Sequence, residues 1–117
     1  MFDGLWTGEW RSNINNLQLG TGVIIFRQGK VFGGNDRFYF VGTYHSTGNC
    51  FDGNLNVTYH AGEPLGIFGL ADINQSEDMA ITGQLTGDEI KLEGTLQSNR
   101  KLKLQGRLQK QAGPEIF

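Results

Sequence analysis

Three side chains near the middle of the sequence could form a nucleophilic catalytic group. Cys50 is the only cysteine, His45 lies before it and Asp52 after it. A thiol next to a histidine base is an activated nucleophile, and a carboxylate can orient the base. However, a Gly-Asn turn separates His45 from Cys50, and the same residues are typical of polar strand ends and of a small packed thiol. We therefore expect no catalytic residues and predict that the chain is not an enzyme.

Glycine-rich residues 22–30, "GVIIFRQGK", superficially resemble a phosphate-binding loop. That loop has four residues before its Gly-Lys pair and a Ser or Thr after it, whereas here six residues come before Gly29-Lys30 and Val31 follows. The pattern instead predicts a hairpin turn with Gly29 at positive φ, and "GGND" predicts a second turn. His45 and His60 are separated by a turn and no second pair offers ligand spacing, so we expect no metal and no cofactor.

A basic stripe could contact phosphate groups: Lys101, Lys103 and Arg107 fall on the polar face of the last predicted strand. No aromatic residues alternate with them to stack on bases, and lysine on an exposed strand also prevents edge-to-edge aggregation. With 10 basic and 12 acidic residues, the net charge of -2 attracts neither nucleic acid nor an anionic membrane. We expect neither as a partner.

Length and composition predict one all-β domain covering residues 1–117. The chain has 18 glycines and two prolines, and no convincing amphipathic helix. A single cysteine allows no intramolecular disulfide, and the first residues show no signal-peptide pattern. We expect a cytoplasmic protein.

The clearest pattern in the sequence is strict alternation of apolar and polar residues, typical of half-buried strands. Short polar segments, "TGDE" and "QSNR", separate the last three strands and favour an antiparallel meander. Aromatic residues strengthen the same pattern in the first half. The apolar rows are Trp6, Gly8 and Trp10; Phe38, Phe40, Gly42 and Tyr44; Leu55, Val57 and Tyr59; Met79, Ile81, Gly83 and Leu85; Ile90, Leu92, Gly94 and Leu96; and Leu102, Leu104, Gly106 and Leu108.

Residues 22–27, 30–34 and 50–60 complete a set of about eight strands. Glycines in the middle of the inner rows allow sharp bending, so we predict a small antiparallel eight-stranded meander barrel. Such a barrel is filled by side chains or holds one small ligand. The residues that could surround an apolar ligand are Trp6, Trp10, Phe40, Tyr44 and Tyr59.

Residues 61–75 are apolar without clear alternation and contain Pro64. We interpret them as a crossing loop or a short helical turn that covers one end of the sheet, with Phe68 as a plug.

Two segments are apolar on both faces, although a barrel strand has only one inner face. They are residues 23–26 and 38–41. Their outward side chains must be covered by another part of the chain or by another molecule. We expect a homodimer, with Val23, Ile25, Tyr39 and Val41 on the dimer or partner surface.

The N-terminal residues "DGLWTGEW", followed by "GTGVIIFRQGKVFGGNDRFYFVGTY", resemble the GrlR-like negative regulators of bacterial type III secretion. The resemblance covers about the first 45 residues. It implies a lipocalin-like calycin barrel of eight antiparallel strands, dimers, and a non-enzymatic regulatory function in bacteria through protein binding. The alternative is a carrier or sensor of a small apolar ligand.

A shorter resemblance links Gly8-Glu9-Trp10 to the G-x-W motif of lipocalins, in which a basic residue of the last strand packs near the tryptophan; Arg107 is the candidate here. The founding GrlR-like regulator binds its activator through a surface acidic run. This chain has "HSTGNCFDG" there, with Asp52 as the only acid, so no partner-binding residue is transferred from that family.

Overall fold

The computed structural model describes residues 2–13, 18–62 and 76–117, with the side chains of residues 18 and 19 left out. Within those ranges the chain forms eight strands and one 3-10 turn. They are β1 (Gly4–Ser12), β2 (Gln18–Arg27), β3 (Lys30–Gly34), β4 (Phe38–Thr47), β5 (Cys50–Tyr59), β6 (Ser76–Thr86), β7 (Glu89–Leu96), β8 (Lys103–Ala112) and η1 (Pro114–Ile116).

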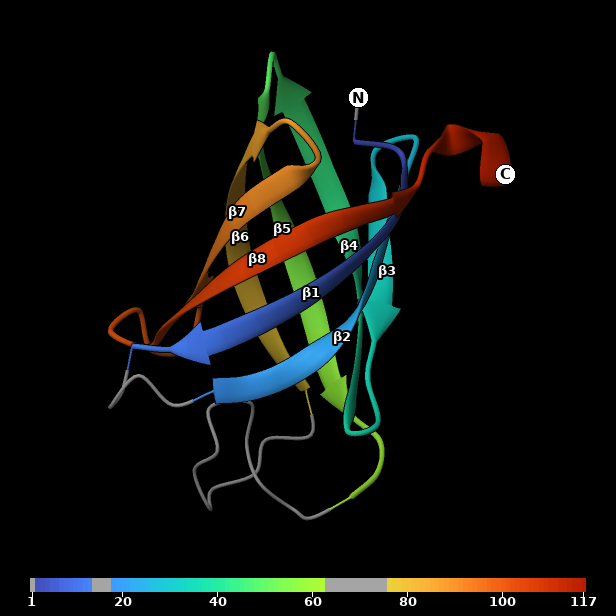
Figure 1. Ribbon diagram of the computed structural model, residues 1–117. Coiled ribbons are helices and arrows are strands. Elements are labelled where there is room, and N and C mark those ends of the chain that lie inside the picture. The colour runs from blue at the N-terminus through green and yellow to red at the C-terminus, as the bar shows by residue number, and fades with distance from the viewer. Residues whose placement is uncertain (1, 14–17, 63–75) are drawn as a thin grey trace.

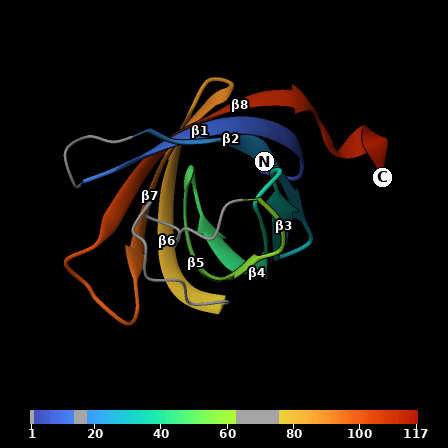
Figure 2. The ribbon, with the colours of Figure 1, turned by 90° about the horizontal axis from the view of Figure 1, so that it is seen from below.

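Each strand pairs antiparallel with the next one along the chain, and β1 pairs with β8 to close the barrel. Figure 1 shows the strands running obliquely across the molecule, and Figure 2, seen from below, shows them around a ring. The β2–β3, β4–β5 and β6–β7 connections lie at one end, which is the upper end in Figure 1. The β3–β4 and β7–β8 connections lie at the lower end. The predicted antiparallel meander barrel is confirmed.

Alternating burial explains why these segments form strands. β7 and β8 alternate between buried and exposed residues over most of their length, and the predicted apolar rows of β6–β8 face the interior. The core contains Ile81, Ile90, Leu92, Leu104 and Leu108, among others. Period-two patterning therefore sets which face of each strand is inside.

Two tight turns set the position of β3. Gln28 and Gly29 both have positive φ values, 49° and 82°, as a two-residue hairpin turn between β2 and β3 requires. At the other end of β3, the Asn35 carboxamide oxygen accepts hydrogen bonds from the Arg37 and Phe38 amides, each 2.9 Å long. Both predicted turns are confirmed, and they hold the shortest strand of the barrel between β2 and β4.

Aromatic side chains fill the upper half of the barrel. Phe2 is buried, and its ring centroid lies 5.1 Å from that of Phe51, while Phe26 lies 5.0 Å from Tyr44. Trp6 is fully buried, and its indole N–H donates to the Phe2 carbonyl over 2.8 Å. The N-terminal residues therefore close this end of the barrel.

Residues 63–75, including Phe68 and most of the predicted crossing loop, lie outside the described residues. β8 ends at Ala112, two residues before Pro114, which has no N–H for a strand ladder, and η1 follows beside β1.

Candidate functional site

The most unusual surface of the barrel is the outer face of β2, β3 and β4, which we call the apolar face. Four large hydrophobic side chains are strongly exposed there: Val23 (42%), Phe32 (36%), Tyr39 (47%) and Val41 (53%). Ile25, between Leu5 on β1 and Phe32 on β3, is half-buried. Exposed apolar side chains grouped over adjacent strands mark an interaction site more often than scattered single ones do.

Strand pairing arranges these residues in two rows across the apolar face. Ile25, Phe32 and Val41 lie opposite one another in the first row. The second row contains Val23, Gly34 and Tyr39, so its middle position has no side chain. The two rows are adjacent because their residues are two apart along each strand.

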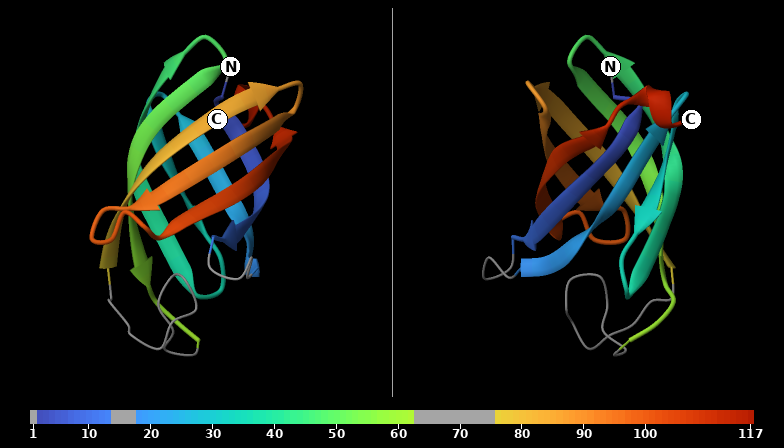
Figure 3. Two further views of the ribbon diagram at one scale, coloured as in Figure 1. Left: turned by 90° about the vertical axis from the view of Figure 1, so that its left-hand side faces the viewer. Right: turned by 45° about the vertical axis from the view of Figure 1, so that its right-hand side comes forward.

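The opposite side of the barrel has a different character. The outward residues of β6, β7 and β8 include seven exposed polar or charged side chains: Thr82, Gln84, Lys91, Glu93, Lys103, Gln105 and Arg107. Figure 3 shows these strands, in gold to red, facing the viewer on the left, and β1–β3, in blue to teal, coming forward on the right. Among the described residues, the large hydrophobic side chains that are strongly exposed therefore lie on one side of the sheet or at the C-terminal end, where Ile116 and Phe117 are also exposed.

Sequence reasoning selected Val23, Ile25, Tyr39 and Val41 for this surface, and the structure brings all four together on neighbouring strands. It missed Phe32. The alternation within "KVFGG" could have identified Phe32, because a strand that buries Val31 directs Phe32 outward. Leu5 is similarly placed beside Ile25 by the β1–β2 register.

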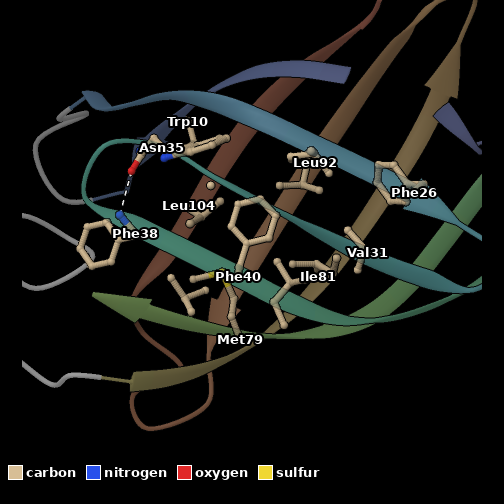
Figure 4. A pocket seen from close by; sticks show the side chains of 14 residues that line it. Trp10, Phe26, Val31, Asn35, Phe38, Phe40, Met79, Ile81, Leu92 and Leu104 are labelled. Atoms are coloured by element: carbon tan, nitrogen blue, oxygen red, sulfur yellow. Dashed lines mark hydrogen bonds between the residues drawn. The ribbon is translucent and has the colours of Figure 1, made fainter. Parts of the chain in front are cut away.

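The barrel interior contains an apolar cavity of about 50 Å³ in its lower half. Figure 4 shows Trp10, Asn35 and Phe38 at one end of it and Phe26 at the other. The lining residues are Trp10, Ile24, Phe26, Val31, Gly34, Asn35, Phe38, Phe40, Leu55, Val57, Met79, Ile81, Leu92 and Leu104. An apolar cavity of roughly 150 Å³ binds benzene, so this one accommodates only a molecule of a few heavy atoms without side-chain movement.

The five residues predicted to surround a ligand are distributed over the barrel. Trp10 and Phe40 line the cavity. Trp6 and Tyr44 belong to the aromatic packing of the upper end, and Tyr59 donates its hydroxyl hydrogen to the Gly62 carbonyl and packs against Phe38. The structure thus brings two of the five together at the cavity.

A polar cluster joins the N-terminal segment to the upper end of the barrel. The Tyr44 hydroxyl donates to the Asp3 carboxylate over 2.8 Å, and the Gln28 amide donates to both carboxylate oxygens at 3.2 Å. Burial, the hydrogen bond to Asp3 and the negative charge of Asp3 together raise the pKa of Tyr44 to about 12. The cluster fixes the first residues of β1 against the β2–β3 turn.

The residues considered for catalysis lie on the outer surface. His45 lies opposite Asp52 in the β4–β5 pair, while Cys50 lies opposite Thr47 and is exposed. Among the described residues, no hydrogen bond joins any two of these three side chains, and no group of three or more His, Cys, Asp or Glu side chains could hold a metal ion. In residues 2–13, 18–62 and 76–117, no helix is long and apolar enough to cross a membrane.

Arg107 does not pack near a tryptophan as the lipocalin resemblance implies. Its neighbours Gly106 and Leu108 face the interior, so the alternation along β8 directs Arg107 outward, with its Nε 3.8 Å from Glu89. Lys110 places its ammonium group 5.8 Å from the centre of the Trp6 ring, which is not the tryptophan of the Gly8-Glu9-Trp10 motif. Lys101 and Lys103 are also exposed, as on a solvated face.

These features define the class of protein: an up-and-down antiparallel β-barrel of lipocalin-like architecture, with a nearly filled interior and one apolar outer face. Comparison of the chain with known protein-family models and with curated protein sequences finds no match.

Proposed function

We propose that this protein is a non-enzymatic, cytoplasmic regulator of the GrlR-like kind, which acts by binding other protein chains through its apolar face. The barrel supplies a rigid platform, and self-association as a homodimer is part of the proposal. The observation that supports it is the cluster of Val23, Phe32, Tyr39 and Val41, each more than a third exposed on adjoining strands.

The small volume of the interior cavity, about 50 Å³, favours this function over transport of a ligand. Protein interfaces have an apolar, aromatic-rich core within a polar rim. The apolar face has that composition, with Thr21 and Thr43 at its margins and Arg27 and Lys30 at its upper end.

Site-specific photocrosslinking in cells of the source tests the proposal. A benzophenone amino acid at Val41 lies on the apolar face, and the same group at Gln84 on β6 is the matched control, because both positions are exposed on outer strand faces. We expect discrete crosslinked protein products at position 41 that are absent at position 84. No product at position 41, or the same products at both positions, would contradict the proposal.

The second candidate function is binding of a small apolar ligand in the cavity. The core residues that line the cavity are apolar, and the Asn35 carboxamide lies at one end of it, and both features support this function. Native mass spectrometry tests it. A discrete added mass that disappears when Val57→Phe fills the cavity would support it, whereas an unliganded wild-type protein would not.

A further inference from the structure

Asn35, which lines the cavity at its lower end, has one polar group without a partner. Its side-chain oxygen accepts hydrogen bonds from the Arg37 and Phe38 amides, each 2.9 Å long, and Figure 4 shows the second of these bonds. The backbone N–H of Asn35 donates to the Phe38 carbonyl, and its carbonyl oxygen lies 3.0 Å from Nε2 of His60. In the part of the chain that the structure describes, only the side-chain nitrogen, Nδ2, donates to nothing.

The hydrogen bonds of the β3–β4 turn decide which way the carboxamide faces. Two backbone N–H groups require an oxygen at one side of the carboxamide, so the other side must carry the NH2 group. A Cβ on Gly20 of β2 would lie 3.6 Å from Nδ2, so the glycine leaves open the space that a side chain would occupy there. Asn35 is half-buried and belongs to the lining of the cavity. Its Nδ2 is therefore an oriented donor at one end of an apolar space.

The other lining groups restrict the chemistry of a ligand further. None of the described residues in the lining is charged, so an ionised ligand would lose its hydration without gaining an ion pair. The indole N–H of Trp10 can only donate, the Asn35 oxygen already accepts two hydrogen bonds, and the Met79 thioether is a weak acceptor. A ligand hydroxyl would leave its hydrogen unpaired here, whereas a carbonyl oxygen needs only a donor.

The volume of the cavity limits the size of the ligand. A cavity of roughly 150 Å³ holds benzene, which has six heavy atoms. The cavity in this barrel is about 50 Å³. A ligand whose oxygen is bound by Asn35 can therefore place only a short aliphatic chain among the core side chains, such as Phe40 and Leu104.

We propose that the cavity is a binding site for a short, uncharged aliphatic carbonyl compound, whose oxygen accepts a hydrogen bond from Nδ2 of Asn35. This inference rests on the second candidate function, since it assigns the class of ligand to the same cavity. Asn35 then has two roles. Its oxygen closes the turn between β3 and β4, and its nitrogen selects the ligand.

Nuclear magnetic resonance titrations of isotope-labelled protein test the ligand class. Butanone, sec-butanol and xenon serve as a carbonyl, a hydroxyl and an apolar probe. We expect butanone to bind more tightly than sec-butanol and to move the Asn35 side-chain N–H resonances downfield. Xenon should shift the methyl resonances of lining residues such as Ile81 without that downfield change. This measurement uses the wild-type protein alone, so it does not depend on how well a variant folds.

Asn35→Asp separates the two roles of the side chain. The variant keeps an oxygen for the Arg37 and Phe38 amides but replaces the NH2 group with a second acceptor. It is expected to weaken butanone binding by roughly three- to tenfold, the effect of one hydrogen bond, and to change xenon binding by less than about twofold. Asn99→Asp is the matched control and should change neither, because the Asn99 oxygen likewise accepts from a backbone amide, that of Lys101, at an exposed site far along the chain.

Three results would overturn the inference: equal butanone binding by the wild type and Asn35→Asp, tighter binding of sec-butanol than of butanone, or unmoved Asn35 side-chain resonances at saturating butanone. If xenon binds in any of these cases, the cavity remains a site for small apolar molecules and only the assigned ligand class fails. If neither xenon nor butanone binds, the second candidate function fails together with the inference.

Discussion

At the scale of single residues, the burial of Tyr44 and its contact with Asp3 make the stability of the folded protein fall at alkaline pH. The pKa of Tyr44 is raised from 10.0 to about 12 in the folded protein. Its stabilising contribution is therefore complete below pH 10 and is lost as the pH rises toward 12. We expect the free energy of unfolding to fall by about 1–2 kcal/mol more in the wild type than in Tyr44→Phe over this range.

Urea unfolding at pH 9, 10, 11 and 12 measures this difference, because other titrating groups affect both proteins equally. Absorbance titration of the three tyrosines provides the control, since the component that ionises near pH 12 should be missing from Tyr44→Phe. Parallel stability curves for the two proteins would contradict the assignment.

Gly83 shows how a single missing side chain shapes the core. A Cβ at this position would overlap the ring of Phe51, which is buried across the β5–β6 pair. We expect Gly83→Val to lower the free energy of unfolding by about 1–3 kcal/mol through overpacking. Thr82→Val, the exposed neighbour on β6, should change it by less than about 0.5 kcal/mol.

Chemical denaturation measures both variants, and Phe51→Leu combined with Gly83→Val should recover part of the loss. If Phe51→Leu lowers the free energy of unfolding of the Gly83→Val protein by as much as it does in the wild type, then contact with Phe51 does not explain why residue 83 is glycine.

At the scale of elements, the β2–β3 turn contains a residue that is not optimal for its backbone. Gln28 has φ of 49°, a left-handed conformation that asparagine and glycine adopt more readily. We expect Gln28→Asn to raise the free energy of unfolding by about 0.5 kcal/mol. Gln28→Val, which is β-branched, should lower it by about 1 kcal/mol. Thermal unfolding of the two variants beside the wild type tests the expected order.

Strand positions were predictable because alternation and turn chemistry act locally. Residues 30–34 were predicted as a strand, and β3 has those bounds. The inner row Ile90, Leu92, Gly94 and Leu96 is likewise buried. Local patterns report only which side chains face outward, so they place Val23, Phe32 and Val41 on the outer side of the barrel but do not show that these three residues adjoin one another. That relation depends on the register across three strands.

For a similar reason, the sequence could not predict which inner residues pack together at the upper end and which surround the cavity. Trp6 and Trp10 belong to one alternating row of β1, yet Trp6 packs in the aromatic upper end and Trp10 lines the cavity. A Cβ on Gly22 would lie 2.8 Å from the Trp10 ring, so the space for that ring is left by a glycine on a neighbouring strand. Packing between strands, rather than the pattern within one strand, decides where a cavity remains.

At the scale of the whole molecule, ring closure makes the barrel one cooperative unit. β1 pairs with both β2 and β8, so it cannot leave the sheet without breaking two strand pairs. Trp6 and Trp10 are the only tryptophans and report from different parts of this strand. We expect the fluorescence transition of Trp6 and that of Trp10 each to coincide with the loss of far-ultraviolet circular dichroism.

Trp10→Phe and Trp6→Phe isolate the two signals, and each variant is compared with its own circular dichroism curve in guanidinium chloride. The two substitutions change the stability of the protein by different amounts. The test is therefore whether the fluorescence and circular dichroism transitions of the same variant coincide, and transitions of different variants are not compared. A fluorescence change that precedes the loss of strand signal in the Trp6→Phe protein would mean that the lower end of the barrel opens first. In that case the cavity end would be a separate unit, and closure through β1 and β8 would not couple the two ends.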